Sequence, residues 1–360
     1  MCCGVSLPTA IIEPSAGRAE AGGAPLRAVA MWLLGCCAMI FAMVVIGGIT
    51  RLTLSGLSIT EWQPVTGILP PLSGAGWAAE FEKYRQIPQY RLLHAGMSLA
   101  DFQTIYWWEY VHRLWGRLIG VIYAAPFLYF WLRGRLPRRL LGPLGGILLL
   151  GAAQGALGWY MVESGLADRV DVSQYRLVAH LALALAIYGL TLWIALDLML
   201  ERPRAGVASV WRRSAETMIA LVALTIVAGG FVAGLHAGLT YNTFPLMDGR
   251  FVPLDYGQLH PFFRNWFENV AAVQFDHRVL AMTTAAAAAL LWLAGRRAPL
   301  PRSARLALHA LLVTAALQFA LGVSTLLLVV PIPLAAAHQA GAVLLLTAAI
   351  VFRHALPGAA

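Results

Sequence analysis

The sequence predicts an all-α polytopic membrane protein, with eight transmembrane helices arranged as two tandem four-helix bundles related by pseudo-two-fold symmetry. Of the 360 residues, 59% are hydrophobic and only 12% are charged. Long uncharged runs of membrane-spanning length recur along the chain, and motifs of the first half recur in the second. Because backbone polar groups must be satisfied inside lipid, helices are the expected spanning structure.

The spans follow one another closely from residue 28 to residue 352. We expect helices at 28–49, 110–132, 140–162, 177–196, 217–235, 270–294, 306–330 and 334–352. The first run is too long for a signal peptide and lacks a small-residue cleavage pattern after it, so it should remain in the protein. The resulting boundaries are an N-terminal extension 1–27, an N-terminal bundle 28–198, a linker 199–216, a C-terminal bundle 217–353 and a tail 354–360.

The basic residues indicate how the helices are oriented. A net charge of +9 could suggest nucleic acid as a partner, but the arginines gather in alternate loops. Groups of four lie in 133–139, 202–213 and 296–305, whereas the opposite loops hold fewer for their length. Because cytoplasmic loops are rich in Lys and Arg, we expect both termini, the linker and the tail in the cytoplasm, and no nucleic-acid partner.

Four kinds of motif recur in the same order in both halves: a double glycine, a His-Arg step, a glutamine segment and a single histidine. They are Gly47-Gly48 and Gly229-Gly230, His112-Arg113 and His277-Arg278, Gln154 to Gly158 and Gln318 to Gly322, and His180 and His338. Because each unit has an even number of spans, both halves should share one topology, unlike the inverted repeats of many transporters.

Four histidines lie inside spans at similar depth: His112 and His180 in the first unit, and His277 and His338 in the second. An ionisable residue in a span is by default a functional hypothesis, and facing helices of a bundle can present two imidazoles to a haem iron. We therefore predict one haem for each pair. The alternative for any single histidine is a hydrogen bond to backbone, and zinc is disfavoured because neither unit has a third ligand at motif spacing.

The units differ beside the first histidine of each pair. Glu109 precedes His112 by three residues, almost one helical turn, whereas Gln274 holds that place before His277. We predict that Glu109 is an acid/base or charge-stabilising group at a substrate, which makes the N-terminal unit the catalytic one. The alternative is an acid at a helix start that interacts favourably with the macrodipole.

The arginines that follow the two histidines, Arg113 and Arg278, project from another helix face. Their planar cations suit either haem propionates or lipid headgroups, and the sequence does not decide between these roles. Among the other histidines, His236 follows a glycine-rich turn and could line the edge of a cofactor. We expect the rest to be structural or interfacial; they are His94, His260, His309 and His354.

The motifs resemble those of the haem A synthase family over about residues 28–352. The segments that carry the resemblance are Arg51 to Pro64, Gly67 to Pro71, Trp107 to Arg113, Gly238 to Gly249, Asp276 to Arg278 and His338-Gln339. Membership implies conversion of haem O to haem A, by oxidation of the ring's C8 methyl group to a formyl group, for terminal cytochrome oxidases. It implies two successive hydroxylations, giving a geminal diol that loses water.

The resemblance also implies roles for individual residues. His112 and His180 would hold haem O and its product haem A, His277 and His338 would ligate haem b, and Glu109 would be the essential acid. Haem b would relay electrons from an unidentified donor. By its position, the long outward loop 51–105 would cover the substrate.

The family context implies partners and a location. The partners are haem O, a haem O synthase (protohaem farnesyltransferase), cytochrome oxidase assembly factors and membrane lipid, and a homo-oligomer is left open. No cysteine lies in an outward loop, so the chain resembles the cysteine-free class of proteobacteria and mitochondria, and we expect a bacterial inner membrane. The alternatives are a di-haem b-type electron-transfer protein without substrate oxidation, and a transporter, which would favour broken helices at mid-depth.

Overall fold

The computed structural model describes residues 23–63, 66–167, 169–200 and 208–356. Within these ranges the chain forms helices and loops, with one isolated β-bridge between Met247 and Arg250. Most of the predicted extension 1–27 and of the tail 354–360, and the middle of the linker 199–216, lie outside the described residues.

Eight helices in the described ranges are long and apolar enough to cross a membrane, which confirms the predicted spans. They are α1 (Gly23–Leu52), α4 (Leu99–Leu132), α5 (Arg138–Leu166), α6 (Gln174–Met199), α7 (Ser209–Gly234), α9 (Val270–Gly295), α10 (Arg302–Leu327) and α11 (Ile332–His354). Helix α4 begins well before residue 110, where the prediction placed it. Ser98 and Asp101 form a capping box there, each side chain bonding the other's backbone N–H.

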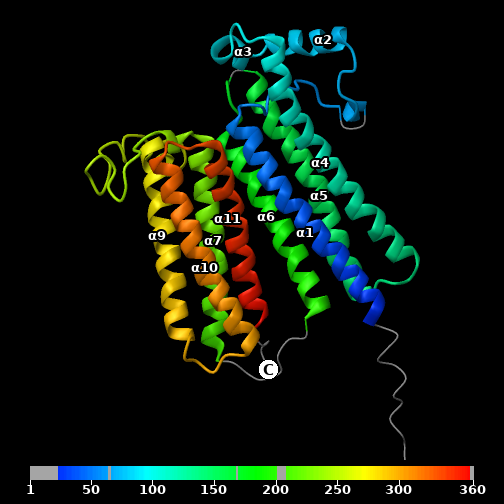
Figure 1. Cartoon of the computed structure of the whole chain (residues 1–360), viewed down its shortest axis with the longest axis vertical. Helices are drawn as coiled ribbons and strands as arrows, with labels where there is room; N and C mark the ends of the chain where they lie inside the picture. The colour runs from blue at the N-terminus through cyan, green and yellow to red at the C-terminus, as the bar shows by residue number, and fades with distance from the viewer. Residues whose placement is uncertain (1–22, 64–65, 168, 201–207, 357–360) are drawn as a thin grey trace, which may run out of the picture.

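The loops at one end of the bundle, which are the outward loops of the predicted topology and are called the outer loops below, contain short helices. These are η1 (Thr66–Ile68), α2 (Gly74–Arg85), α3 (Pro88–Leu93), η2 (Ala237–Leu239), η3 (Phe262–Arg264) and α8 (Asn265–Glu268). Helices α2 and α3 lie beyond the outer end of the bundle, next to the start of α4 (Figure 1). Buried Tyr84, Phe102 and Tyr106 form a small aromatic core that attaches them to α4.

The spanning helices pack as two groups of four, side by side (Figure 1). In the first group α1 contacts α4 and α6, and α5 contacts α4 and α6; in the second, α7 contacts α9 and α11, and α10 contacts α9 and α11. The groups meet where α6 packs on α7 and α11 and where α1 packs on α11. The pseudo-two-fold relation between them stays a prediction.

The largest apolar core lies away from the outer loops and draws on both groups. Its buried members include Leu33 of α1, Leu192 of α6, Leu308 of α10 and Phe352 of α11. All four spanning histidines lie on the outer side of this core. Each is closer to the helix end that leads into the outer loops than to the opposite end. The four histidines, called the histidine layer below, therefore lie between this packed core and the outer loops.

Candidate functional site

Each of the four spanning histidines packs edge-on against a glycine of a neighbouring helix. The pairs are His112 with Gly47, His180 with Gly158, His277 with Gly229, and His338 with Gly322. A β-carbon at any of these glycines would lie only 2.8–3.0 Å from the ring carbon Cε1. Glycine thus allows each ring to approach the backbone closely, and the four sites share one local design.

In the second group, His277 and His338 face each other with ring centroids 6.5 Å apart and ring planes at 84°. This spacing suits two imidazoles on opposite sides of one metal ion, since each side needs a metal–nitrogen bond of about 2 Å and about 1 Å from nitrogen to ring centre. The Nδ1 atom of His277 lies 3.1 Å from the carbonyl oxygen of Thr225. Donation from Nδ1–H to a carbonyl leaves the Nε2 lone pair free for a metal.

Gln318 supports the second histidine of this pair. Its Nε2 donates to the His338 carbonyl oxygen at 2.9 Å and lies 3.1 Å from His338 Nδ1. Its Oε1 is buried without a hydrogen-bond partner among the described residues. Both rings of the second group therefore have a neighbour at Nδ1.

The first group differs at this point. The Nδ1 atoms of His112 and His180 are buried and have no hydrogen-bond partner among the described residues. Gln154 donates to the His180 carbonyl at 2.9 Å, as Gln318 does to His338. Both pairs thus have glycines against the rings and a glutamine on the carbonyl of the second histidine. They differ at Nδ1, which has polar neighbours in the second pair but none among the described residues in the first.

The residues of both pairs fit a haem. Each histidine is half-buried, which leaves surface for a ligand. Among the described residues, no three His, Cys, Asp or Glu side chains gather into a metal-binding group. Two imidazoles alone suit a haem iron, because the porphyrin supplies the remaining ligands, whereas zinc needs further protein ligands.

Glu109 is only 3% exposed, and both its carboxylate oxygens are bound. Oε2 accepts from the Ser58 hydroxyl and the Ile59 N–H, each at 2.7 Å. Oε1 accepts from Arg113 Nη2 at 2.6 Å and Nε at 3.0 Å. Because α4 begins at Leu99 and Asp101 occupies its first turn, Glu109 does not have the alternative role of a helix-start acid.

Both arginines fasten the chain segment that follows the first helix of their group. The acceptors are the carbonyl oxygens of Ile59 and Glu61 for Arg113, and of Tyr241 and Thr243 for Arg278. Bidentate donation of this kind suits the planar guanidinium. The predicted contact with haem propionates or headgroups stays a prediction for both residues.

Gln274 occupies the place of Glu109 but has the opposite hydrogen-bonding role toward the loop. Its Nε2 donates to the carbonyl oxygens of Ala237 at 2.8 Å and Thr240 at 2.6 Å. Its Oε1 accepts from Arg278 at 3.0 Å. The loop of the first group thus presents donors to a carboxylate, and the loop of the second presents acceptors to an amide.

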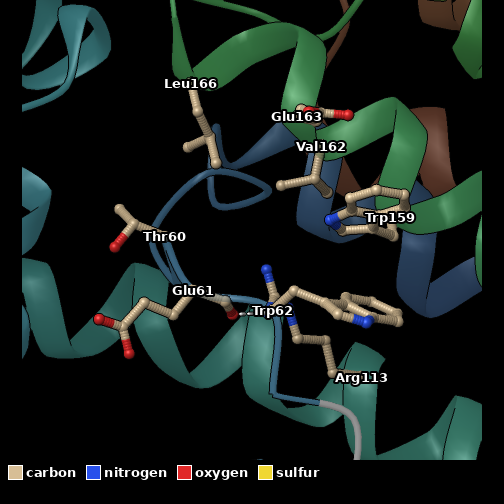
Figure 2. Close-up of a pocket in the computed structure, with 8 residues that line it drawn as sticks. All are labelled: Thr60, Glu61, Trp62, Arg113, Trp159, Val162, Glu163 and Leu166. Carbon is tan, nitrogen blue, oxygen red and sulfur yellow. Dashed lines mark hydrogen bonds between the residues drawn. The ribbon is translucent and has the colours of Figure 1, made fainter.

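Arg113 also lines two cavities on the outer side of the first group. One, of about 50 Å³, lies between the segment Thr60 to Trp62 and helix α5. Figure 2 shows Arg113 in it with Trp62 and Trp159, whose ring centroids are 6.3 Å apart, and with Glu163. The other, of about 240 Å³, lies between α2, α4 and the loop before α2. None of the four spanning histidines lines either cavity.

The side chains of four further histidines contact protein groups. His236 joins the two groups of helices, because its Nε2 lies 2.5 Å from the Asp171 carboxylate and its Nδ1 lies 3.2 Å from Arg51 Nη2. The predicted place of His236 at a cofactor edge stays a prediction. The other contacts are His94 with Tyr84, His309 with Trp292, and His354 with Asp197.

Sequence reasoning missed the contacts by which Ser58, Thr225 and Gln318 hold the site residues in place. Ser58 fixes Glu109, and Thr225 and Gln318 contact the histidine rings of the second group. The available signal was the spacing within the repeat, since Thr225 and Gln318 each stand four residues before a glycine that faces a histidine. Residues four apart lie on one face of a helix.

Comparisons with known proteins agree with the geometry. Residues 30–350 match a family model described as cytochrome oxidase assembly protein. A haem A synthase of Nitrosospira multiformis is 56% identical over 335 residues, covering 92% of this chain and 94% of the relative. One of Rhodospirillum centenum is 53% identical over 336 residues, covering 93% and 89%. Human haem A synthase COX15 is 45% identical over 333 residues, covering 90% and 81%.

Proposed function

The chain belongs to the haem A synthase family of cytochrome oxidase assembly proteins, and from this premise we propose that it oxidises the C8 methyl group of haem O to the formyl group of haem A. The product would serve terminal cytochrome oxidases. The observation that carries the proposal is the set of four histidines, two in each group of helices, with each ring seated against a glycine.

The two pairs have different tasks in this proposal. His277 and His338 hold haem b, which when bound supplies one-electron redox chemistry, and His112 and His180 hold haem O. The Nδ1 contacts of His277 and His338 support the first assignment, because groups that orient a ligand histidine strengthen metal binding. The unpartnered Nδ1 atoms of His112 and His180 suit a substrate that must leave after each turnover.

Glu109 acts at the substrate edge, where it stabilises positive charge or moves protons. Ser58, the Ile59 N–H and Arg113 hold its carboxylate in one orientation. A fixed orientation matters because small displacements of a reacting group cost large factors in rate. For Arg113 and Arg278, contact with haem propionates and contact with lipid headgroups both stay open.

The test is extraction and chromatography of haems from membranes that contain the chain together with a haem O synthase. The wild type should yield haem A, and Glu109→Gln should yield none or stop at a hydroxylated intermediate. A di-haem electron-transfer protein would instead leave haem O unchanged in both, with only haem b bound. That result would overturn the proposed reaction.

The helices make the chain a multi-pass membrane protein. We further propose a bacterial inner membrane with both termini in the cytoplasm, because the arginine-rich loops lie at the end opposite the histidine layer. Reporter fusions after residues 135 and 250 should be active on the cytoplasmic and the opposite side, respectively. The proposed partners are a haem O synthase, oxidase assembly factors and an unidentified electron donor.

A further inference from the structure

Gln339 follows His338 and crosses from the second group of helices to the first. Its Nε2 donates to the carbonyl oxygen of Val44 in α1 at 2.8 Å. The Oε1 of the same amide lies where a β-carbon on Gly48 would stand, 2.0 Å from it. The Gln339 side chain is therefore seated on α1 by a hydrogen bond and by a glycine that leaves it room.

The neighbouring glycine of α1 faces the other histidine pair. A β-carbon at Gly47 would lie 2.8 Å from His112 Cε1. Two consecutive glycines thus contact His112 on one side and Gln339 on the other. A continuous packed connection runs from His338 through Gln339, Gly48 and Gly47 to His112.

The contact between α6 and α7 has the same arrangement of two consecutive glycines, but without the hydrogen bond. Gly229 faces His277, while a β-carbon at Gly230 would lie 3.0 Å from Val178 and 3.4 Å from Leu181 of α6. Leu181 follows His180 as Gln339 follows His338. Leucine cannot donate a hydrogen bond, so only the α1–α11 contact ties the residue after a histidine to the backbone of the other group.

We propose that Gln339 is a positioning residue that holds the two histidine pairs in the geometry required for passing reducing equivalents from the C-terminal site to the N-terminal site. This inference rests on the proposed function. Coupling between sites travels through contiguous packed and hydrogen-bonded groups, and a double-mutant cycle is the test of such coupling. The amide of Gln339 is the polar member of this connection.

The experiment compares purified wild type, Gln339→Leu, Gly48→Ala and a Gly48→Ala/Gln339→Leu double variant, each loaded with haem in both sites. The readouts are haem b content, the optical spectrum of the reduced C-terminal haem, and the rate at which the N-terminal haem is reduced after it. Gln339→Leu should keep the content and spectrum but slow that reduction at least fivefold. Gly48→Ala should slow it in the wild type and add little when Gln339→Leu is already present.

Leu181→Ala is the matched control, since it removes a side chain beside a histidine at the other contact between the groups. It should change the reduction rate less than twofold. The inference is overturned if Gln339→Leu reduces the N-terminal haem at the wild-type rate, if it loses haem b together with the rate, or if the two substitutions act additively. Failure of the proposed function is seen separately, as absence of haem A in wild type, and leaves the reduction measurement intact.

Discussion

Glu109 and Gln274 lie at equivalent places, yet their surroundings require opposite hydrogen-bonding groups. The carboxylate of Glu109 faces a hydroxyl, an amide N–H and a guanidinium, which are all donors. The amide nitrogen of Gln274 faces two carbonyl oxygens. Each loop therefore selects its own side chain, and the difference visible in the sequence reflects a built difference between the two halves.

Glu109→Gln removes a charge and also turns an amide NH₂ toward a donor, whichever way the amide is placed. We expect haem A formation to fall about 100-fold or more, in the range typical of general acid–base groups, while haem b content stays unchanged. Ser58→Ala, which removes one donor and keeps the charge, should cause a smaller loss. Equal haem A yields from all three proteins would contradict a role for Glu109 at the substrate.

Gln274→Glu is the reciprocal change. A carboxylate there would face the carbonyl oxygens of Ala237 and Thr240, and their lost donor should lower the free energy of unfolding by about 1–3 kcal/mol. Thermal unfolding of the purified protein measures this, and haem b content should fall with it. An unchanged melting temperature would show that the loop can turn its carbonyls away.

Gln318→Leu removes the side chain that contacts His338 Nδ1. Loss of such a supporting contact commonly weakens metal binding about 10- to 100-fold, so haem b should be lost on dilution or dialysis. Gln154→Leu is the matched change in the first half, where the glutamine donates to the His180 backbone carbonyl, and haem b retention should not change. The ratio of bound haem to protein decides between the two outcomes.

Among the helices, α1 shows most directly how a backbone contact holds a site. Gly47→Ala would place a methyl group 2.8 Å from the His112 ring, whereas a β-carbon at Gly35 of the same helix meets nothing within 4 Å. We expect Gly47→Ala to abolish haem O binding at the N-terminal site and Gly35→Ala to leave it unchanged. Optical titration of each purified variant with haem O gives the answer. Tight binding by the Gly47→Ala protein would argue against this placement of His112.

The outer helices α2 and α3 should respond to pH through His94, whose ring lies 2.6 Å from the Tyr84 hydroxyl. Burial lowers the pKa of His94 below its ordinary value of 6.5. Below pH 6.5 the unfolded segment therefore binds more protons than the folded segment. The contribution of His94 to the stability of the folded segment is full above pH 6.5 and declines as the pH falls below it. Protection factors measured by hydrogen exchange over 74–94 should be smaller at pH 5.5 than at pH 7.5, and His94→Gln should remove most of this difference.

The elements were predictable where hydrophobicity decides them. All eight spans followed from apolar runs, because lipid leaves few alternatives to a helix. The start of α4 was not predicted, since the residues from Leu99 to Glu109 include polar side chains and α4 there extends beyond the apolar run as far as a capping box. Helices α2 and α3 were also missed, because a small aromatic core rather than an apolar periodicity holds them in place.

For the whole molecule, the sequence repeat predicted which residues recur but not what they contact. It singled out the double glycines and the glutamine segments, and the structure gives each a specific neighbour. The contacts of Arg113 and His236 could not be predicted, because they depend on where loops distant in sequence come to lie. Composition fixes which residues enter the membrane, while loop conformation decides which side chains meet at its surface.

The unpartnered Nδ1 atoms of His112 and His180 also bear on how readily the two proposed haems exchange. When either ring turns, packing against its glycine opposes the motion, and no hydrogen bond at Nδ1 has to break. The rings of His277 and His338 must each lose a polar contact at Nδ1 before they can turn away from a bound haem. In the proposed enzyme, the haem of the C-terminal site is therefore held more firmly than the substrate haem of the N-terminal site.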